Sequence, residues 1–247
     1  MSEAPRGDFY VGYLALPWGH SRFLRVFVPL ALWAMAALGG VMVWSMRRPG
    51  PAVWRTGAVQ AWHGTVRERP YPALELDDGS SVLLVEVGKR GAQERVAGLD
   101  GRSATVRGWS LERDGRRLIE VSPERDGVEP SAGGSRSESP TPRALGAFVG
   151  VGEIVDAKCF LGAMKPGDGL GHRSCAALCV EGGIPPMLLL WRAGEPSFLL
   201  VLGPDGQPIG ARAARWVGER VEVRGEAFAR GGLIEVRVPD GGVRRAP

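Results

Sequence analysis

The most hydrophobic part of the chain is residues 26–46, "VFVPLALWAMAALGGVMVWSM", which holds no charged side chain over 21 positions. A helix of this length crosses the hydrocarbon core of a bilayer. Arginines stand on both sides of it, where the membrane–water interfaces would lie. We predict a single transmembrane helix here, preceded by an N-terminal arm over residues 1–25. No small-residue cleavage motif follows the segment, so we expect an anchor rather than a cleaved signal peptide.

Beyond the anchor, the hydrophobic pattern changes to short alternating or fully apolar runs that are typical of β-strands. In the first half, residues 57–68, 71–78 and 80–87 fit strands, residues 92–99 fit a short helix, and two more strands fit within residues 99–123. In the second half, residues 150–158, 186–191 and 197–203 fit strands, residues 211–218 fit a short helix, and residues 220–229 and 232–238 fit strands. The same order of elements therefore occurs twice.

The two halves also share short sequence pieces, V-R-G followed by L-I-E-V. Three strands, a short helix and two strands are the order of an OB-like barrel, a small closed sheet. We predict a mainly β protein: one N-terminal transmembrane helix, then two tandem small OB-like β-barrels over residues 57–122 and 147–240. Residues 123–146 are rich in Pro, Ser and Gly and predict a flexible linker.

Charge is distributed unevenly along the chain. The formal net charge is +4, and residues 1–56 account for all of it, which leaves both predicted barrels close to neutral. A surface without net positive charge does not attract the phosphate backbone of a nucleic acid, so we expect no nucleic-acid partner. The aromatic stretch "DFYVGYLALPW" within the arm is too short to span a membrane. It predicts contact with the membrane surface or with an integral membrane protein complex.

Candidate chemistry is concentrated in residues 156–179, "DAKCFLGAMKPGDGLGHRSCAALC". This stretch holds all three cysteines, and it lengthens the link between strands one and two of the second barrel only. In this fold that link is a usual ligand-binding loop. "HRSCAALCV" predicts a short helix with His172, Cys175 and Cys179 on one face, because they stand at i, i+3 and i+7.

Three cysteines and one histidine form a complete tetrahedral ligand set for zinc. We therefore predict a transition-metal site made of Cys159, His172, Cys175 and Cys179. Met164 lies between Cys159 and the predicted helix, and as a peripheral thioether ligand it would make the set softer and favour copper.

Three other interpretations of the loop stay open. A disulfide from Cys159 to Cys175 or Cys179 would tie the loop to its strand and leave one odd thiol. A histidine beside a cysteine could create a nucleophilic or redox thiol. The glycine-rich "KPGDGLGHR" could cradle an anion, although it does not match a phosphate-loop pattern.

Two resemblances bear on these alternatives. "CAALC" is similar to the Cys-x3-Cys of the dinuclear copper centre in cytochrome oxidase subunit II, but Gly183 and Pro186 replace the histidine and methionine of that pattern. The wider pattern K-C-x-L-G-x-M-K-P-G…H-x-x-C-x-x-x-C…G-G-I-P-P resembles a group of uncharacterised membrane-anchored bacterial proteins. That resemblance, with a short arm before a long C-terminal region, implies a single-pass protein of the bacterial inner membrane with periplasmic barrels.

We expect a membrane-anchored metal-binding accessory protein that serves electron transfer or delivers metal to a membrane respiratory complex. The alternative is an accessory or assembly subunit whose cysteine loop is stapled by a disulfide and binds a protein partner. No nucleotide, haem or flavin motif and no complete active site is evident, so an enzyme is the less favoured hypothesis. The first barrel contains no cysteine, and we expect it to act as a spacer or docking module.

Overall fold

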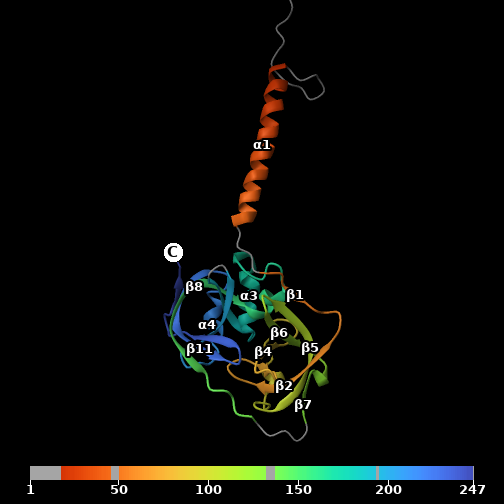
Figure 1. Ribbon diagram of the computed structural model, residues 1–247, viewed down its shortest axis with the longest axis vertical. Helices are drawn as coiled ribbons and strands as arrows, with labels where there is room; N and C mark the ends of the chain where they lie inside the picture. The colour runs from red at the N-terminus through yellow and green to blue at the C-terminus, as the bar shows by residue number, and fades with distance from the viewer. Residues whose placement is uncertain (1–17, 46–49, 132–136, 193–194, 247) are drawn as a thin grey trace, which may run out of the picture. The chain divides into compact units, whose positions relative to one another are not determined.

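The computed structural model describes residues 18–45, 50–131, 137–192 and 195–246. It divides into two compact units, residues 1–48 and 49–247. In the first unit, helix α1 runs from Trp18 to Ser45 (Figure 1). Within Trp18–Val43, an 18-residue window has a mean hydropathy of 2.2 and no buried residue, so this helix is long and apolar enough to cross a membrane. The helix begins ahead of Val26 and includes the arginines at positions 22 and 25.

The second unit begins with a closed five-stranded barrel. Its strands are β2 (Gln60–Arg67), β3 (Ala73–Glu75), β4 (Ser81–Val85), β5 (Ser103–Arg113) and β6 (Arg116–Val121), with α2 (Gln93–Val96) between β4 and β5. All neighbours pair antiparallel except β4 and β6, which are parallel, and pairing of β5 with both β2 and β6 closes the sheet. The short strands β1 (Val53–Trp54) and β7 (Val128–Pro130) extend β5.

The second barrel repeats this topology. Its strands are β8 (Arg143–Asp156), β9 (Pro186–Arg192), β10 (Glu195–Leu202), β11 (Arg220–Arg230) and β12 (Leu233–Arg237), with α4 (Ala211–Ala214) between β10 and β11 and β13 (Val243–Arg245) paired to β11. Strands β10 and β12 are the parallel pair, and β11 closes the sheet against β8. The order of strands confirms the predicted pair of OB-like barrels. The predicted insertion between the first two strands is also confirmed, and it contains η2 (Cys159–Ala163), η3 (Leu170–His172) and α3 (Arg173–Glu181).

One part of the sequence repeat is not structurally equivalent. Trp109 and Glu226 both follow the glycine of V-R-G, and they face Glu120 and Arg237, respectively, across the final hairpin. Glu120 therefore corresponds to Arg237 rather than to Glu235, and the two L-I-E-V pieces are offset by two positions. An even offset keeps the same side chains pointing inward, so the alternation that predicted the strands is unaffected.

Part of the segment predicted as a linker is regular structure. Strand β7 adds to the first barrel, and β8 already begins at Arg143. Ser137 also exchanges contacts with the first barrel: its N–H donates to the carbonyl of Gly101 at 2.8 Å, and its carbonyl accepts from Arg67 at 2.8 Å. Hydrogen bonds thus hold β7 and Ser137 against the first barrel, whereas the start of β8 belongs to the second.

The two barrels share one hydrophobic cluster. Residues of the first barrel, among them Tyr71, Leu83 and Leu111, pack with the insertion and with the second barrel, including Phe160 and Phe198. Cys159 and Cys179 belong to this shared cluster. In Figure 1 the insertion helix α3 lies between the orange to yellow-green first barrel and the second barrel, which runs from green (β8) to blue. The cysteine loop is therefore packed between the barrels.

Candidate metal site between the barrels

The insertion begins at a buried acidic residue. Asp156 is the last residue of β8, is fully buried, and accepts the backbone N–H of Cys159 at 2.8 Å. This bond fixes the first turn of η2 and holds Cys159 in the shared cluster. A strand that ends in a buried carboxylate thus positions the first cysteine.

The predicted helix is present as α3, and it carries the other two cysteines. Cys175 and Cys179 are one turn apart on it, and His172 directly precedes its first residue. Cys179 is buried and Cys175 is half-buried, so one edge of the cluster reaches the surface. The helix therefore presents these three residues to Cys159, as their spacing predicted.

Two overlapping groups of potential metal ligands result. Within each group all ligand atoms lie within 4.8 Å of one another: Cys159, His172 and Cys175 form one, and Asp156, Cys159 and Cys179 form the other. The Sγ atoms of Cys159 and Cys179 are 3.9 Å apart. Two sulfur ligands of a tetrahedral zinc site lie about 3.8 Å apart, because each Zn–S bond is about 2.3 Å. These two thiols are already at ligand spacing.

Asp156 also orients the histidine. Its Oδ2 lies 3.1 Å from Nε2 of His172, and both side chains are buried. An ionised carboxylate only accepts hydrogen bonds, so Nε2 carries the proton and Nδ1 is the nitrogen available to a metal. The hydrogen bond to Asp156 raises the pKa of His172. A carboxylate that holds a ligating histidine in this way is the usual arrangement behind protein metal sites.

The thiols of Cys159 and Cys179 are hydrogen-bonded to each other. The hydrogen bond between Cys159 and Cys179 raises the pKa of Cys159, and burial raises it further. The same hydrogen bond lowers the pKa of Cys179. Of these two thiols, Cys179 is therefore the one that loses its proton more readily.

The first barrel contributes a side chain to the site, in addition to the spacer or docking role expected of it. Nζ of Lys89, from the loop after β4, lies 2.8 Å from Sγ of Cys175, and this contact raises the pKa of Lys89. The end of α3 docks on the same loop, because the carbonyl of Gly182 accepts the N–H of Gly91 at 2.9 Å.

A second lysine joins the insertion to the first barrel. Lys158 and Glu120 form an ion pair whose side chains are each 5% exposed. The ammonium group of Lys158 also donates to the carbonyls of Glu86 at 2.8 Å and Gly88 at 2.7 Å. All three of its donors are therefore satisfied, which is the condition under which a buried lysine is tolerated.

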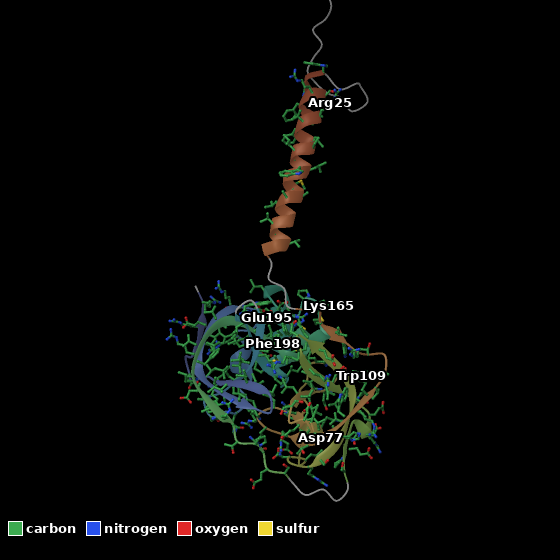
Figure 2. All side chains as sticks on the ribbon, in the orientation of Figure 1. Arg25, Asp77, Trp109, Lys165, Glu195 and Phe198 are labelled. Carbon is green, nitrogen blue, oxygen red and sulfur yellow. The ribbon has the colours of Figure 1, made fainter. Side chains whose placement is uncertain are left out.

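Two candidate ligands lie apart from these groups. Met164 follows η2 and is 44% exposed, and its backbone N–H bonds to the carbonyl of Cys159. Its role as a peripheral ligand stays a prediction. Lys165, labelled in Figure 2, is also exposed. In the glycine-rich turn, the N–H of Gly169 donates to Oε1 of Glu153, so a protein carboxylate already occupies the place of an anion there.

Sequence reasoning missed Lys89, Asp156, Lys158 and Glu120. One signal was available: the chain has three lysines among its 31 basic residues, of which Lys158 and Lys165 lie in the insertion and Lys89 contacts its Cys175. No protein-family model, curated protein or solved structure matches the chain. The chemistry of the cluster is therefore the basis on which a function is inferred.

Proposed function

We propose that the protein is a membrane-anchored metal-binding protein that holds a transition metal, zinc or copper, through Cys159, His172, Cys175 and Cys179. The observation that carries this proposal is a pair of overlapping ligand groups that share Cys159: one adds His172 and Cys175, and the other adds Cys179 and Asp156. Thiolate and imidazole are the donors that zinc and copper prefer. When bound, such a metal supplies Lewis-acid or redox chemistry.

The surroundings of the cluster support ligation. Asp156 holds His172 in the tautomer that leaves Nδ1 free for the metal. Three thiolates and a divalent cation leave one net negative charge, and the ammonium group of Lys89 beside Cys175 offsets it. The packing of both barrels around Cys159 and Cys179 excludes water from the buried side.

The half-buried edge at Cys175 suits either role that we propose for the metal: electron transfer to a partner or transfer of the metal to it. The partner we propose is an integral membrane complex of the respiratory type, in the inner membrane of a bacterium, with the barrels in the periplasm. The apolar helix, which is long enough to span a membrane, supports an anchored protein. A shallow site allows a partner to approach within contact distance.

Elemental analysis tests the proposal directly. The full chain is purified in maltoside micelles without oxygen, and metal content and the absorption spectrum are measured. We expect about one equivalent of metal, lost in Cys175→Ser and Cys179→Ser and retained in the control Ser174→Ala on the exposed face of the same helix. Copper with charge-transfer bands supports electron transfer or delivery, whereas colourless zinc supports a structural site. Stoichiometric metal in both cysteine variants would refute the assignment.

A second candidate function follows from the spacing of Cys159 and Cys179. All three cysteines are free thiols in the structure, but a rotation of the side chains at 3.9 Å would bring these two sulfurs within bonding reach under oxidation. The insertion would then be a stapled surface for a protein partner. Alkylation of the denatured protein without reductant separates the candidates, because a disulfide protects two thiols and a lost metal leaves three reactive.

A further inference from the structure

Arg113 is a buried cation with unused hydrogen-bond donors. It ends β5, is 9% exposed, and stacks its guanidinium carbon 4.4 Å from the centre of the Phe160 ring. Its Nε and Nη1 atoms are buried and have no hydrogen-bond partner among the described residues. Buried charged donors are normally paired, because leaving them unpaired costs free energy.

The second barrel shows how the same position is satisfied elsewhere. Arg230 stands at the equivalent end of β11, five residues after the V-R-G glycine as Arg113 is. Arg230 forms an ion pair with the buried Glu235, whose Oε1 lies 2.9 Å from its Nε, although this Nε, like that of Arg113, makes no hydrogen bond among the described residues. In the register of the parallel strands, Leu118 takes the place of Glu235 in the first barrel. The first barrel therefore keeps the arginine and lacks its acid.

Arg113 lines a cleft of about 460 Å³ between the final hairpins of the two barrels. The other charged side chains of this cleft already have partners in the protein. Arg117 pairs with Glu112, Arg116 donates to the carbonyl of Gly232, Asp78 accepts from Ser80, and Asp114 accepts the N–H of Gly50. Arg113 is thus the cleft's one buried guanidinium without a partner among the described residues.

We propose that Arg113 binds the phosphate group of a ligand that enters this cleft. A guanidinium matches phosphate oxygens with parallel N–H donors, and the ring of Phe160 behind it keeps the guanidinium plane fixed. The positive side chain of Arg116 stands at the same cleft. A small phosphate compound and a lipid headgroup carry this same group. The phosphate would bind through Arg113 and not through the cysteine ligands, so its binding does not require a bound metal.

Thermal unfolding of the full chain in maltoside micelles tests the proposal, with inorganic phosphate as the probe and chloride at equal ionic strength as the reference. At about five times the dissociation constant, phosphate should raise Tm by roughly 2–4 °C. Arg113→Met keeps the contact with Phe160 and should abolish the rise, and Arg113→Gln should do the same. The control Arg212→Met, which removes an exposed arginine paired with Asp240, should keep it.

Two further measurements identify whether the phosphate belongs to a lipid or to a soluble compound, and whether an acid of the protein already pairs with Arg113. A rise with short-chain phosphatidic acid but not with inorganic phosphate assigns the site to a lipid headgroup. Asp168 is the nearby acid whose charge most favours the cationic form of Arg113. If Asp168→Asn binds phosphate and the wild type does not, Asp168 is the true partner and the proposal fails. It also fails if the wild type responds to neither probe, or if the Arg113 variants respond equally.

Discussion

At the scale of single residues, each carboxylate oxygen of Asp156 accepts a different hydrogen bond. Oδ1 accepts the N–H of Cys159, and Oδ2 accepts Nε2–H of His172. Asp156→Asn keeps the shape but loses the charge that orients and polarises the imidazole. We expect metal affinity to fall by about 10–100-fold, since that is the usual effect of removing a carboxylate behind a ligating histidine.

Competition with a chromogenic chelator measures this affinity. The control is Asp168→Asn, which removes an acid from the same insertion that makes no contact with any of the four proposed ligands among the described hydrogen bonds and ion pairs. An unchanged affinity in Asp156→Asn would show that Asp156 serves packing of the loop and not the metal.

Lys158 gives the second prediction at this scale. Lys158→Met should destabilise the protein by about 3–5 kcal/mol, because Glu120 remains buried without its cation. The double variant Lys158→Met, Glu120→Met removes both charges and should recover most of that loss. Urea unfolding followed by tryptophan fluorescence measures each free energy. A double variant as unstable as the single one would mean that the pair is not the source of the effect.

The site was predictable from the sequence only as far as local spacing reaches. Helical periodicity, which needs no tertiary information, places His172, Cys175 and Cys179 where each can reach Cys159. Lys89 and Glu120 come from the first barrel. Lys89 is 86 residues from its partner Cys175, and Glu120 is 38 residues (158 − 120) from its partner Lys158. No periodicity within either segment encodes a contact that depends on how two barrels pack.

At the scale of elements, the end of α3 determines how closely the insertion approaches the first barrel. A Cβ added to Gly182 would lie 1.9 Å from the carbonyl oxygen of Lys89, a backbone atom that cannot rotate away. Gly182→Ala should push α3 outward, weaken the contact between Lys89 and Cys175, and cost about 1–3 kcal/mol of stability. Gly171→Ala, in open space in the same insertion, should have little effect. Equal stability of the two variants would contradict this docking.

Glu153 links the stability of β8 to pH. Burial raises the pKa of Glu153, and the negative charge of Asp168 raises it further, against the hydrogen bond from Gly169. The folded protein then holds this proton to higher pH than the unfolded chain does. The stability gained from protonation is complete below the unfolded pKa and is lost as pH rises through the folded pKa. Glu153→Gln keeps an oxygen acceptor for the N–H of Gly169 but cannot titrate. Its free energy of unfolding should therefore fall less than that of the wild type as pH rises through the folded pKa of Glu153. Urea unfolding at several pH values measures it, and identical slopes in both proteins would contradict the prediction.

The order of the elements followed from the hydrophobic pattern, whereas their register did not. Strands of period two and short helices between turns are visible in one sequence. The match of L-I-E-V in both halves suggested equivalent positions, yet pairing aligns Glu120 with Arg237. Only the partner strand fixes register, and an offset by two leaves the pattern of inward side chains the same. This offset also places Leu118 where the second barrel has Glu235, and so leaves Arg113 unpaired.

At the scale of the whole molecule, the interface between the barrels is the feature that the sequence concealed. The apolar runs of β4 and β9 were correctly assigned to strands, but a run buried by its own barrel looks the same as one buried by a neighbour. Leu83 and Leu189 lie in the cluster that both barrels share, whereas Leu84 and Leu188 lie in the separate cores. Strands with both faces covered carry no polar positions to mark the outside.

This shared cluster predicts that the barrels unfold together. Separation would expose Leu83, Phe160 and Phe198 and would leave the ion pair of Lys158 with Glu120 broken. Residues 49–247 should therefore show one guanidinium transition, the same by far-UV circular dichroism and by tryptophan fluorescence. The isolated second barrel, residues 147–247, should bind a hydrophobic dye and unfold at lower denaturant. Two separate transitions, with the isolated barrel as stable as it is in the pair, would show that the barrels are independent. In that case Lys89 would not be held at Cys175, and the cysteine site would have to function without the first barrel.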